Sequence, residues 1–241
     1  MIKLEPLGNG VEIFVSENHT FGTDAILLSH FAAPRKKDVA CDLGTGCGII
    51  PLLWCRSGVT EKCFGVEIME EGCVLAARSA AHCGFDEKFS VIHSDLLELK
   101  GKLPFGTFNL VTCNPPYKAD GAGIKSKTRA DIVARHETAC TLEDIITVSS
   151  KLLQTGGRLC MCNRPERLAD MISLMRQNKI EPKRMRLVCQ RVGEEPWLVL
   201  LEGRKCGNSG MRISPTLYVE DGENFSQEMI EIYGSYKENY L

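Results

Sequence analysis

Three short stretches of the sequence combine residue types that could bind a ligand and act on it. The first is the loop Gly44-Thr45-Gly46-Cys47-Gly48, which follows an apolar stretch ending at Leu43. Its alternating glycines let the backbone turn tightly and leave room for a ligand against the main chain. Ile49 stands where a dinucleotide fingerprint needs Gly or Ala, and the Gly-Lys-Ser/Thr ending of a phosphate loop is absent. The loop therefore suits a nucleoside ligand without a phosphate.

Two acidic residues follow the next two predicted strands. Glu67 ends a strand nineteen residues beyond Gly48, where a carboxylate can accept hydrogen bonds from both hydroxyls of a ribose. Asp95 follows the next strand, where a carboxylate can accept from the amino group of adenine. Each acid alone is more simply a solvated strand end or a helix cap. Their placement after consecutive strands, beside the glycine loop, favours the ligand.

The tetrapeptide Asn114-Pro115-Pro116-Tyr117 follows the fourth predicted strand. Prolines cannot extend an inner parallel strand, so the sheet must stop here and the loop is stiff. An isolated Pro-Pro-Tyr indicates an exit turn with a packed tyrosine. At this position the Asn114 amide oxygen and the Pro115 carbonyl could accept both N–H bonds of a planar amine and aim its delocalised lone pair. Tyr117 could stack on the same planar group.

The elements that must position these residues alternate along the chain. A turn at Asn9-Gly10 belongs to a strand region at 7–15, and Thr23 is the expected N-cap of the first helix. Strands are predicted at 38–43, 62–67, 89–93, 108–113, 158–162, 185–189 and 196–202, and helices at 24–33, 49–56, 70–83, 142–153 (ended by Gly156-Gly157), 165–177 and 227–232. This alternation predicts a doubly wound α/β fold with a mainly parallel, seven-stranded sheet. Ligands bind beyond the carboxyl ends of such strands.

Composition sets broad limits on the class of protein. The 241 residues carry 29 Lys+Arg against 31 Asp+Glu, a formal net charge of −2, and are 44% hydrophobic, which excludes disorder, collagen and coiled coil. No apolar run approaches the roughly 18 residues that cross a bilayer, and the N-terminus lacks the apolar block of a secretion signal. We expect a cytoplasmic protein, with a monomer favoured and no membrane partner.

The twelve cysteines include no Cys-x-x-Cys pair and lie mostly inside apolar runs. We expect free thiols that act as small core hydrophobes in a reducing compartment, with neither disulfides nor a metal. Cys160 and Cys162 lie on one predicted strand, where alternate positions point to one face. The predicted organisation is an extension at 1–35, a ligand-binding domain at 36–205 and an acidic tail at 206–241.

The glycine loop, Glu67, Asp95 and the strand before Asn114, taken in order, resemble the class I S-adenosylmethionine-dependent methyltransferases. The resemblance implies that the three loop glycines line S-adenosylmethionine, that Asp42 lies near its amino-acid moiety, and that Glu67 and Asp95 hold its ribose and adenine. Asn-Pro-Pro-Tyr resembles the signature of adenine-N6 methyltransferases, which the glutamine-N5 methyltransferases of release factors share. The catalytic residues it implies are Asn114, Pro115, Pro116 and Tyr117.

A wider likeness, over residues 5–205, is to the bacterial tRNA1(Val) adenine-N6 methyltransferase family. It rests on the segment from Phe21 to Leu28 together with the glycine loop and the tetrapeptide, and it implies methylation of the adenosine 3′ of the anticodon in a valine tRNA. It also places Phe21 to Asp24 over the methionine end of the cofactor, although an ordinary capped helix explains that segment equally well. The predicted cofactor-binding residues are Phe21, Gly22, Thr23, Asp24, Asp42, Gly44, Thr45, Gly46, Cys47, Gly48, Glu67, Ile68, Asp95, Leu96 and Asn114.

Two basic segments agree with an RNA substrate. The segment 176–191 holds six bases and one acid, and the loop 118–136 holds five bases and two acids. A solvated face explains either segment more simply, and the loop could also close over a substrate. The predicted RNA contacts are Lys125, Lys127, Arg129, Arg135, Lys183, Arg184 and Arg186. The acidic tail should lie away from this basic surface, and His136 has no assigned role.

Three functions remain open from the sequence. The favoured one is an enzyme that methylates adenine N6 in a tRNA, with a target base exposed in a loop where unstacking is cheap. The second is a protein glutamine-N5 methyltransferase. Against it, only about 35 residues, beginning as a strand, precede the first sheet strand, whereas the glutamine enzymes carry an N-terminal helical domain. The third is a non-catalytic module that binds the cofactor or RNA.

Overall fold

The computed structural model describes residues 1–58, 60–115 and 140–237. Several predicted site residues lie outside these ranges, so their predictions stay untested: Pro116, Tyr117, Lys125, Lys127, Arg129 and Arg135. His136, which has no assigned role, lies outside them as well.

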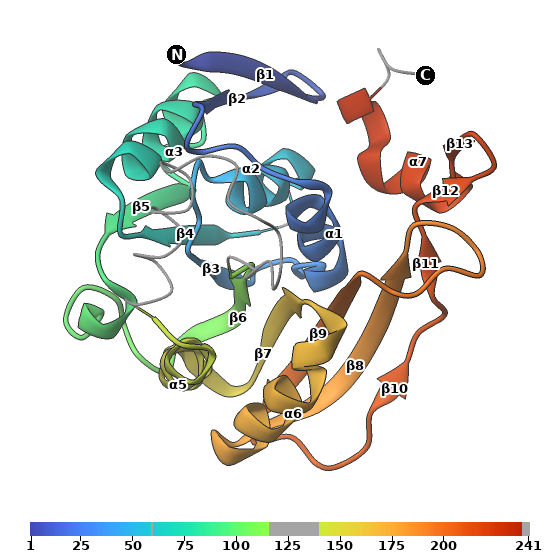
Figure 1. The fold of residues 1–241 in the computed structure, drawn as a ribbon. Coiled ribbons are helices and arrows are strands. Elements are labelled where there is room, and N and C mark those ends of the chain that lie inside the picture. The colour runs from blue at the N-terminus through green and yellow to red at the C-terminus, as the bar shows by residue number, and fades with distance from the viewer. Residues whose placement is uncertain (59, 116–139, 238–241) are drawn as a thin grey trace.

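A nine-stranded sheet forms the centre of the molecule (Figure 1). Its strand order is β10-β8-β9-β7-β6-β3-β4-β5, and β11 also pairs with β8. The seven longer strands are β3 (Val39–Leu43), β4 (Lys62–Glu67), β5 (Phe89–His93), β6 (Phe108–Cys113), β7 (Leu153–Asn163), β8 (Ile180–Cys189) and β9 (Leu198–Lys205). Among the described strand pairs of this sheet, only the two that include β9 are antiparallel: β9 with β7 and β9 with β8. The predicted doubly wound, mainly parallel fold is confirmed.

The two additional strands belong to the chain that follows β9. β10 (Arg212–Ile213) and β11 (Leu217–Tyr218) each pair in parallel with the edge strand β8. Two-residue strands are too short to show an alternating pattern in the sequence, which is why seven strands rather than nine were predicted.

Helices cover both faces of the sheet. α1 (Thr23–Ala32), α2 (Ile49–Ser57) and α3 (Glu70–His82) share one buried cluster with the hairpin of β1 (Lys3–Gly8) and β2 (Val11–Val15). α5 (Leu142–Leu152) and α6 (Leu168–Gln177) share the second cluster. Alternation along β7 separates the two, since Cys160 and Cys162 belong to the first cluster and Leu159 and Met161 to the second. All twelve cysteines are free thiols and nine are buried.

Two local predictions were wrong. Gly156 and Gly157 do not end a helix, because α5 ends at Leu152 and β7 begins at the next residue. A Cβ on Gly157 would lie 2.8 Å from the Phe108 carbonyl oxygen, so the glycine lets β7 pass close to β6 where their register shifts. Thr23 does not cap α1 either. Gly22 is the N-cap, and the Thr23 hydroxyl lies 3.1 Å from the Tyr233 hydroxyl.

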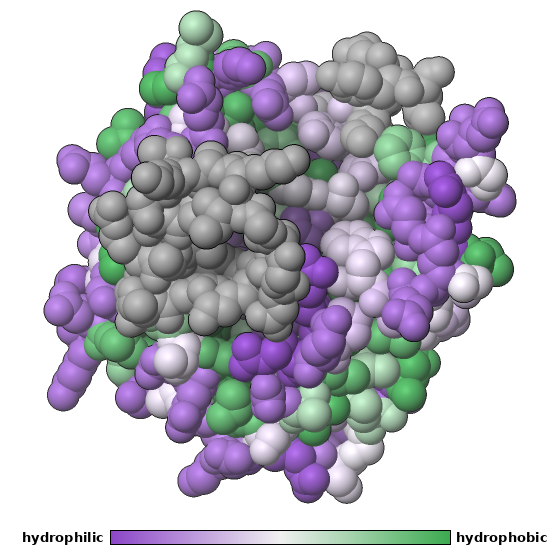
Figure 2. All heavy atoms as spheres, in the orientation of Figure 1, coloured by the Kyte–Doolittle hydropathy of each residue, from purple (hydrophilic) through white to green (hydrophobic). Residues whose placement is uncertain are grey.

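The C-terminal region folds onto the domain. It contains β12 (Glu220–Asp221), β13 (Asn224–Phe225), α7 (Gln227–Tyr233) and η3 (Gly234–Lys237), and Leu217 and Met229 are buried in the first cluster. Hydrophilic side chains gather over α7 and the β12–β13 hairpin, on the right of Figure 2. In the described part of the chain, no helix has the length and apolar character needed to span a bilayer.

Candidate functional site

The register of the central strands brings the predicted site residues to one edge of the sheet. Leu43 at the end of β3 pairs with Cys113 of β6 on one side and with Val66 of β4 on the other. The next residue of each strand is therefore Gly44, Asn114 and Glu67, side by side at the carboxyl edge. Glu67 in turn pairs with His93 of β5, which places Asp95 just beyond.

The glycine loop divides into an open part and a packed part. Gly44 and Gly46 have φ of 70° and 55°, and no described atom lies within 4 Å of where a Cβ would stand on either. Gly48 differs, because its Cβ would lie 2.9 Å from both Ala76 and Phe89. The first two glycines therefore leave a cradle for a ligand, whereas Gly48 lets α2 begin close to α3 and β5.

The other two loop residues point into the protein. The Thr45 methyl group would lie 2.7 Å from a Cβ on Gly65, so this side chain packs on β4, and its backbone N–H donates to the Val66 carbonyl at 3.0 Å. Cys47 is buried, and burial raises its thiol pKa to about 12, so it stays neutral. Both side chains are buried and shape the loop from inside the protein.

Glu67 ties the loop to the start of α3. Its carboxylate is buried and accepts hydrogen bonds from the backbone N–H of Gly46 at 2.9 Å and of Met69 at 2.8 Å. The two bonds use different oxygens, and each carboxylate oxygen has a second acceptor position. Glu67 is therefore fixed at the cradle and has the capacity to accept from hydroxyl groups as well.

His19 is a site neighbour that the sequence analysis did not single out. A Cβ on Gly72 would lie 2.9 Å from Glu67 Cγ and 3.0 Å from His19 Cδ2 and Nε2. The absence of a side chain at Gly72 therefore lets the histidine ring pack beside Glu67. Neither the spacing nor the type of His19 signals this contact in the sequence.

Asp42 is a buried acid beneath the loop. Burial raises the pKa of its carboxyl to about 7; the hydrogen bond from the Thr112 hydroxyl, at 2.6 Å, opposes this, and the Glu67 charge adds to it. No ion pair in the described part of the chain includes this group. A carboxyl held this way would be stabilised as an anion by a cationic ligand group.

Asp95 combines a structural role with a site position. Its Oδ1 accepts from the Leu97 backbone N–H at 2.8 Å and so caps η1 (Leu96–Glu98). Leu96 packs against the second cluster, and Ile68 after β4 is 39% exposed. The cap that was the simpler interpretation of Asp95 is present, and the residue itself lies beyond the carboxyl end of β5.

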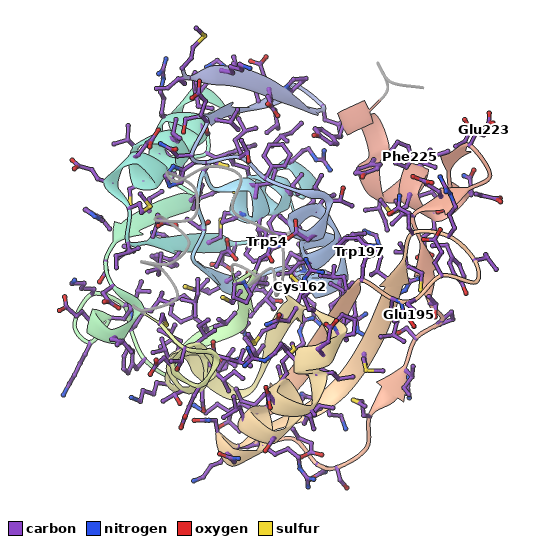
Figure 3. All side chains as sticks on the ribbon, in the orientation of Figure 1. Trp54, Cys162, Glu195, Trp197, Glu223 and Phe225 are labelled. Atoms are coloured by element: carbon purple, nitrogen blue, oxygen red, sulfur yellow. The ribbon has the colours of Figure 1, made fainter. Side chains whose placement is uncertain are left out.

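Asn114 is held from two sides. Its Nδ2 donates to Asp24 Oδ2 at 3.0 Å, and the Cys162 thiol donates to its Oδ1 at 3.1 Å. Asp24 comes from α1. Cys162 comes from β7 and lies in the middle of the molecule (Figure 3). The strand register explains the second contact, since Cys113 pairs with Met161 and the next residues are Asn114 and Cys162. Pro115 is buried directly after Asn114.

The four predicted residues at the start of α1, Phe21 to Asp24, separate into two groups. Asp24 reaches Asn114, and Gly22 makes room for its carboxylate, since a Cβ there would lie 2.5 Å from Asp24 Oδ1. Thr23 and Phe21 instead contact the C-terminal region: the hydroxyl of Thr23 meets Tyr233, and the Phe21 ring lies 6.0 Å from that of Tyr236.

The described basic segment is paired with acids of the same chain. Both guanidinium nitrogens of Arg186 donate to Glu228 at 2.6 and 2.7 Å, and Arg191 lies 2.5 Å from Glu220. Arg184 donates to Glu202 at 2.9 Å, and Lys183 donates to the backbone carbonyl of Asn208 at 3.0 Å. The expectation that the acidic tail lies away from this segment was wrong, because Glu220 and Glu228 of the tail pair with Arg191 and Arg186. These partners give the three predicted RNA contacts here a structural role.

Comparisons with known proteins agree with this geometry. The model of the family "Methyltransferase small domain" matches residues 8–178. A Porphyromonas gingivalis protein named tRNA1(Val) (adenine(37)-N6)-methyltransferase is 28% identical over 189 residues, covering 76% of this chain and 73% of that protein. A Parabacteroides distasonis protein of the same name is 26% identical over 181 residues, covering 75% of each chain.

Solved structures share the fold. A predicted O-methyltransferase from Agrobacterium tumefaciens superposes with a TM-score of 0.72 at 21% identity, covering 89% of this chain and 97% of its own. The P. horikoshii protein TYW2 in complex with MeSAdo gives a TM-score of 0.58 at 11% identity, covering 84% and 70%. At these identities the likeness concerns the fold alone. Because the family model matches more than half of the sequence, from β1 to the end of α6, the chain belongs to the methyltransferase small domain family.

Proposed function

We propose that this chain transfers a methyl group from S-adenosylmethionine to the N6 amine of an adenine in tRNA, the adenosine 3′ of the anticodon in a valine tRNA. The observation that carries the proposal is the position of Asn114, whose amide is held beside the open glycines Gly44 and Gly46. The names of the relatives from Porphyromonas gingivalis and Parabacteroides distasonis support the substrate.

The residues at the carboxyl edge fit S-adenosylmethionine. No described atom lies within 4 Å of a Cβ position on Gly44 or Gly46, and a side chain there would collide with a bound nucleoside. Asp42 would pair with its ammonium group, Glu67 would accept from its ribose hydroxyls, and Asp95 would accept from its adenine amine. When bound, this cofactor supplies an electrophilic methyl group on a sulfonium.

Asn114 and Pro115 would prepare the attacking nitrogen. The lone pair of an aromatic amine is delocalised into the ring, which makes the nitrogen a poor nucleophile. Two carbonyl oxygens that accept its two N–H bonds hold the nitrogen in place and favour a tetrahedral geometry with the lone pair directed outward. A strong base is unnecessary, because the nitrogen becomes acidic once it is methylated and releases a proton to water.

The remaining parts of the proposal follow from this reaction. Residues 36–205 form the cofactor-binding and catalytic domain, with extensions at 1–35 and 206–241. A tRNA-modifying enzyme works where tRNA is present, so we place the protein in the cytoplasm. The tetrapeptide is equally compatible with a glutamine amide as acceptor, which makes a release factor the rival substrate.

The test is transfer of label from methyl-labelled S-adenosylmethionine to bulk tRNA or to a release factor in separate reactions. We expect label in the tRNA, and nucleoside mass spectrometry should identify it as N6-methyladenosine. Asn114→Ala should abolish transfer and change cofactor affinity by less than about threefold. Asn208→Ala is the matched control, because Asn208 is exposed and only its backbone carbonyl is bonded. Label found only in the release factor would refute the proposal.

A further inference from the structure

Asn114 has an amide whose two ends differ in chemistry, and only one end can act on an amine. The Oδ1 end accepts hydrogen bonds and the Nδ2 end donates them. Rotation of the side-chain amide by 180° would present N–H donors to the N–H bonds of a substrate amine, and the contact would become repulsive. The proposed reaction therefore requires something in the protein that fixes the orientation of this amide.

Two neighbours from different elements impose the same orientation. Asp24 carries a carboxylate, which only accepts, and it lies 3.0 Å from Nδ2. Cys162 carries a thiol, which donates, and its sulfur lies 3.1 Å from Oδ1. Exchanging the amide ends would set the Asn114 oxygen against a carboxylate oxygen, which is repulsive, and would replace the bond from the thiol with one in which sulfur is only a weak acceptor. An amide oxygen has two lone pairs, so the bond from the thiol does not by itself block a second donor.

Each partner is itself held in place. Asp24 Oδ1 accepts from the Ala25 backbone N–H at 2.9 Å, and the bare backbone of Gly22 gives the carboxylate its space. Cys162 is fully buried on β7, a strand paired on both sides. Asp24 at the start of α1 and Cys162 on β7 therefore meet at the side chain of Asn114, and each is held by its own element.

We propose that Asp24 and Cys162 are positioning residues that lock the amide of Asn114 with its oxygen as the acceptor for the substrate amine. The consequence for methyl transfer rests on the proposed function, whereas the lock itself is a property of the folded chain. The sequence resemblance places Asp24 beside the cofactor, and the structure gives it this second role. Cys162 was expected only as a core thiol.

The chain offers a matched control for Cys162. Cys160 lies two residues earlier on the same strand, faces the same cluster and is equally buried, but its sulfur lies 3.8 Å from Glu202 instead of near Asn114. Cys160→Ala and Cys162→Ala should therefore lower the melting temperature by similar amounts, because each leaves a cavity of one sulfur atom. Only Cys162→Ala should lower kcat.

The kinetic test compares kcat, the KM for tRNA and the Kd of the cofactor in the full-length chain. Asp24→Asn keeps the shape and removes the charge that forces the orientation, so we expect kcat to fall about 10- to 100-fold while the cofactor Kd changes less than about threefold. Cys162→Ala should lower kcat about three- to tenfold, and Cys162→Ser should restore it, since a hydroxyl donates the same bond. Unchanged kcat in Asp24→Asn and Cys162→Ala, or a rise in Kd that accounts for the loss in Asp24→Asn, overturns the proposal.

Nuclear magnetic resonance separates failure of the lock from failure of the proposed function. In labelled protein without substrate, the Asn114 side-chain amide is identified by the signal pair that disappears in Asn114→Ala. We expect its two protons to be well separated and slow to exchange, and to move together and broaden in Asp24→Asn. If these signals do not change, the lock is absent, whatever the chain methylates. If they change and no tRNA is methylated, the lock stands and the proposed function fails.

Discussion

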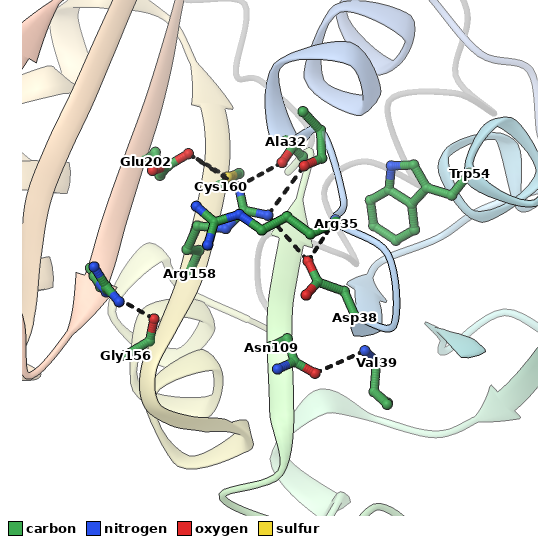
Figure 4. Close-up of polar contacts among 12 residues, drawn as sticks. Ala32, Arg35, Asp38, Val39, Trp54, Asn109, Gly156, Arg158, Cys160 and Glu202 are labelled. Carbon is green, nitrogen blue, oxygen red and sulfur yellow. Dashed lines mark hydrogen bonds and ion pairs between the residues drawn. The ribbon is translucent and has the colours of Figure 1, made fainter. Parts of the chain in front are cut away.

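Asp38 and Asp42 are buried acids at the two ends of the same strand, β3, and they have different hydrogen-bond and charge partners. Asp38, before the strand, lies 3.3 Å from the Arg158 guanidinium and accepts from the Arg35 backbone N–H at 2.8 Å (Figure 4). Asp42, near the carboxyl end, has the hydroxyl of Thr112 as a partner and a pKa raised by burial to about 7. The charge of Asp38 is compensated by Arg158, whereas the charge of Asp42 is one that a ligand could stabilise.

The Asp38 end is part of a network that joins three elements. Arg158 also donates to the carbonyl of Ala32 at the end of α1 and lies 3.4 Å from Glu202 of β9. Its side chain is only 8% exposed, so its charge is stabilised by these partners rather than by water. The contrast with Asp42 teaches that, in the described part of the chain, a buried acid without a cationic partner marks the proposed functional end of this sheet.

The largest effect should come from removing the cation at the structural end. Arg158→Ala leaves Asp38 buried without its cationic partner and leaves Glu202 with Arg184 alone, and we expect the free energy of unfolding to fall by about 3–5 kcal/mol in urea titrations. Arg167→Ala is the control, because Arg167 and Asp170 form an exposed pair that contributes less than about 1 kcal/mol. A loss below about 1 kcal/mol in Arg158→Ala would show that the network is not a stabilising unit.

The same substitution of acid by amide should act in opposite directions at the two ends. Asp38→Asn removes a paired charge and should destabilise the fold. Asp42→Asn removes a buried acid that has no cationic partner in the described part of the chain, so it should raise the melting temperature of the unliganded protein. The same variant should weaken cofactor binding tenfold or more, about 1.4 kcal/mol. Differential scanning fluorimetry and calorimetric titration measure the two effects. Loss of stability in both variants would remove the distinction between the ends.

The strands that carry the site were predictable from the sequence, because they depend on local signals. The strands at 62–67, 89–93 and 108–113 have the predicted bounds, since each is a short apolar run between turn residues. Gly58 ends α2 with φ of 67°, as expected of a left-handed helix end. Glu67, Asp95 and Asn114 were expected beside the glycine loop because ligands bind beyond the carboxyl ends of parallel strands, whereas the site role of Asp42 was implied by the family resemblance.

Other features depend on contacts between distant parts of the chain, which a single sequence does not show. Cys162 reaches Asn114 only because β6 and β7 pair in one particular register. Arg158 is a basic residue at the start of a predicted strand, and nothing local indicates that its partners come from α1 and β9. The ion pair of Arg186 with Glu228 spans 42 residues, so charge counting along the sequence placed the acidic segment wrongly.

A pH titration should sharpen the comparison at the Asp42 end. The folded pKa of about 7 lies above the ordinary aspartate pKa of 3.8, so the folded protein binds this proton more tightly than the unfolded chain. The contribution of Asp42 to stability is therefore fully present below about pH 4 and is lost as the pH rises to about 7. Cofactor affinity should change in the opposite sense and strengthen as the carboxyl ionises, by up to about tenfold per pH unit below 7.

The measurements are calorimetric titrations with S-adenosylmethionine and urea unfolding of the unliganded protein at several pH values. Asp42→Asn is the control, and it should lose this part of both pH dependences. If the wild-type and variant proteins show parallel pH profiles, another group titrates and the assignment to Asp42 is wrong.

The smallest effect is expected from the paired, partly exposed arginine Arg186. If the charge of Arg186 is already neutralised by Glu228, then Arg186→Ala should change the KM for tRNA by less than about twofold and leave its dependence on salt unchanged. A phosphate contact would instead lower the salt slope of tRNA binding by about one unit.

Glu228→Gln distinguishes these two outcomes, because it removes the charge that pairs with the Arg186 guanidinium. Tighter tRNA binding in Glu228→Gln, lost again in the double variant, would mean that this paired arginine is close enough to RNA to bind it once uncompensated. Unchanged binding in all three variants would mean that ion pairing on this face, as at Asp38, serves the fold.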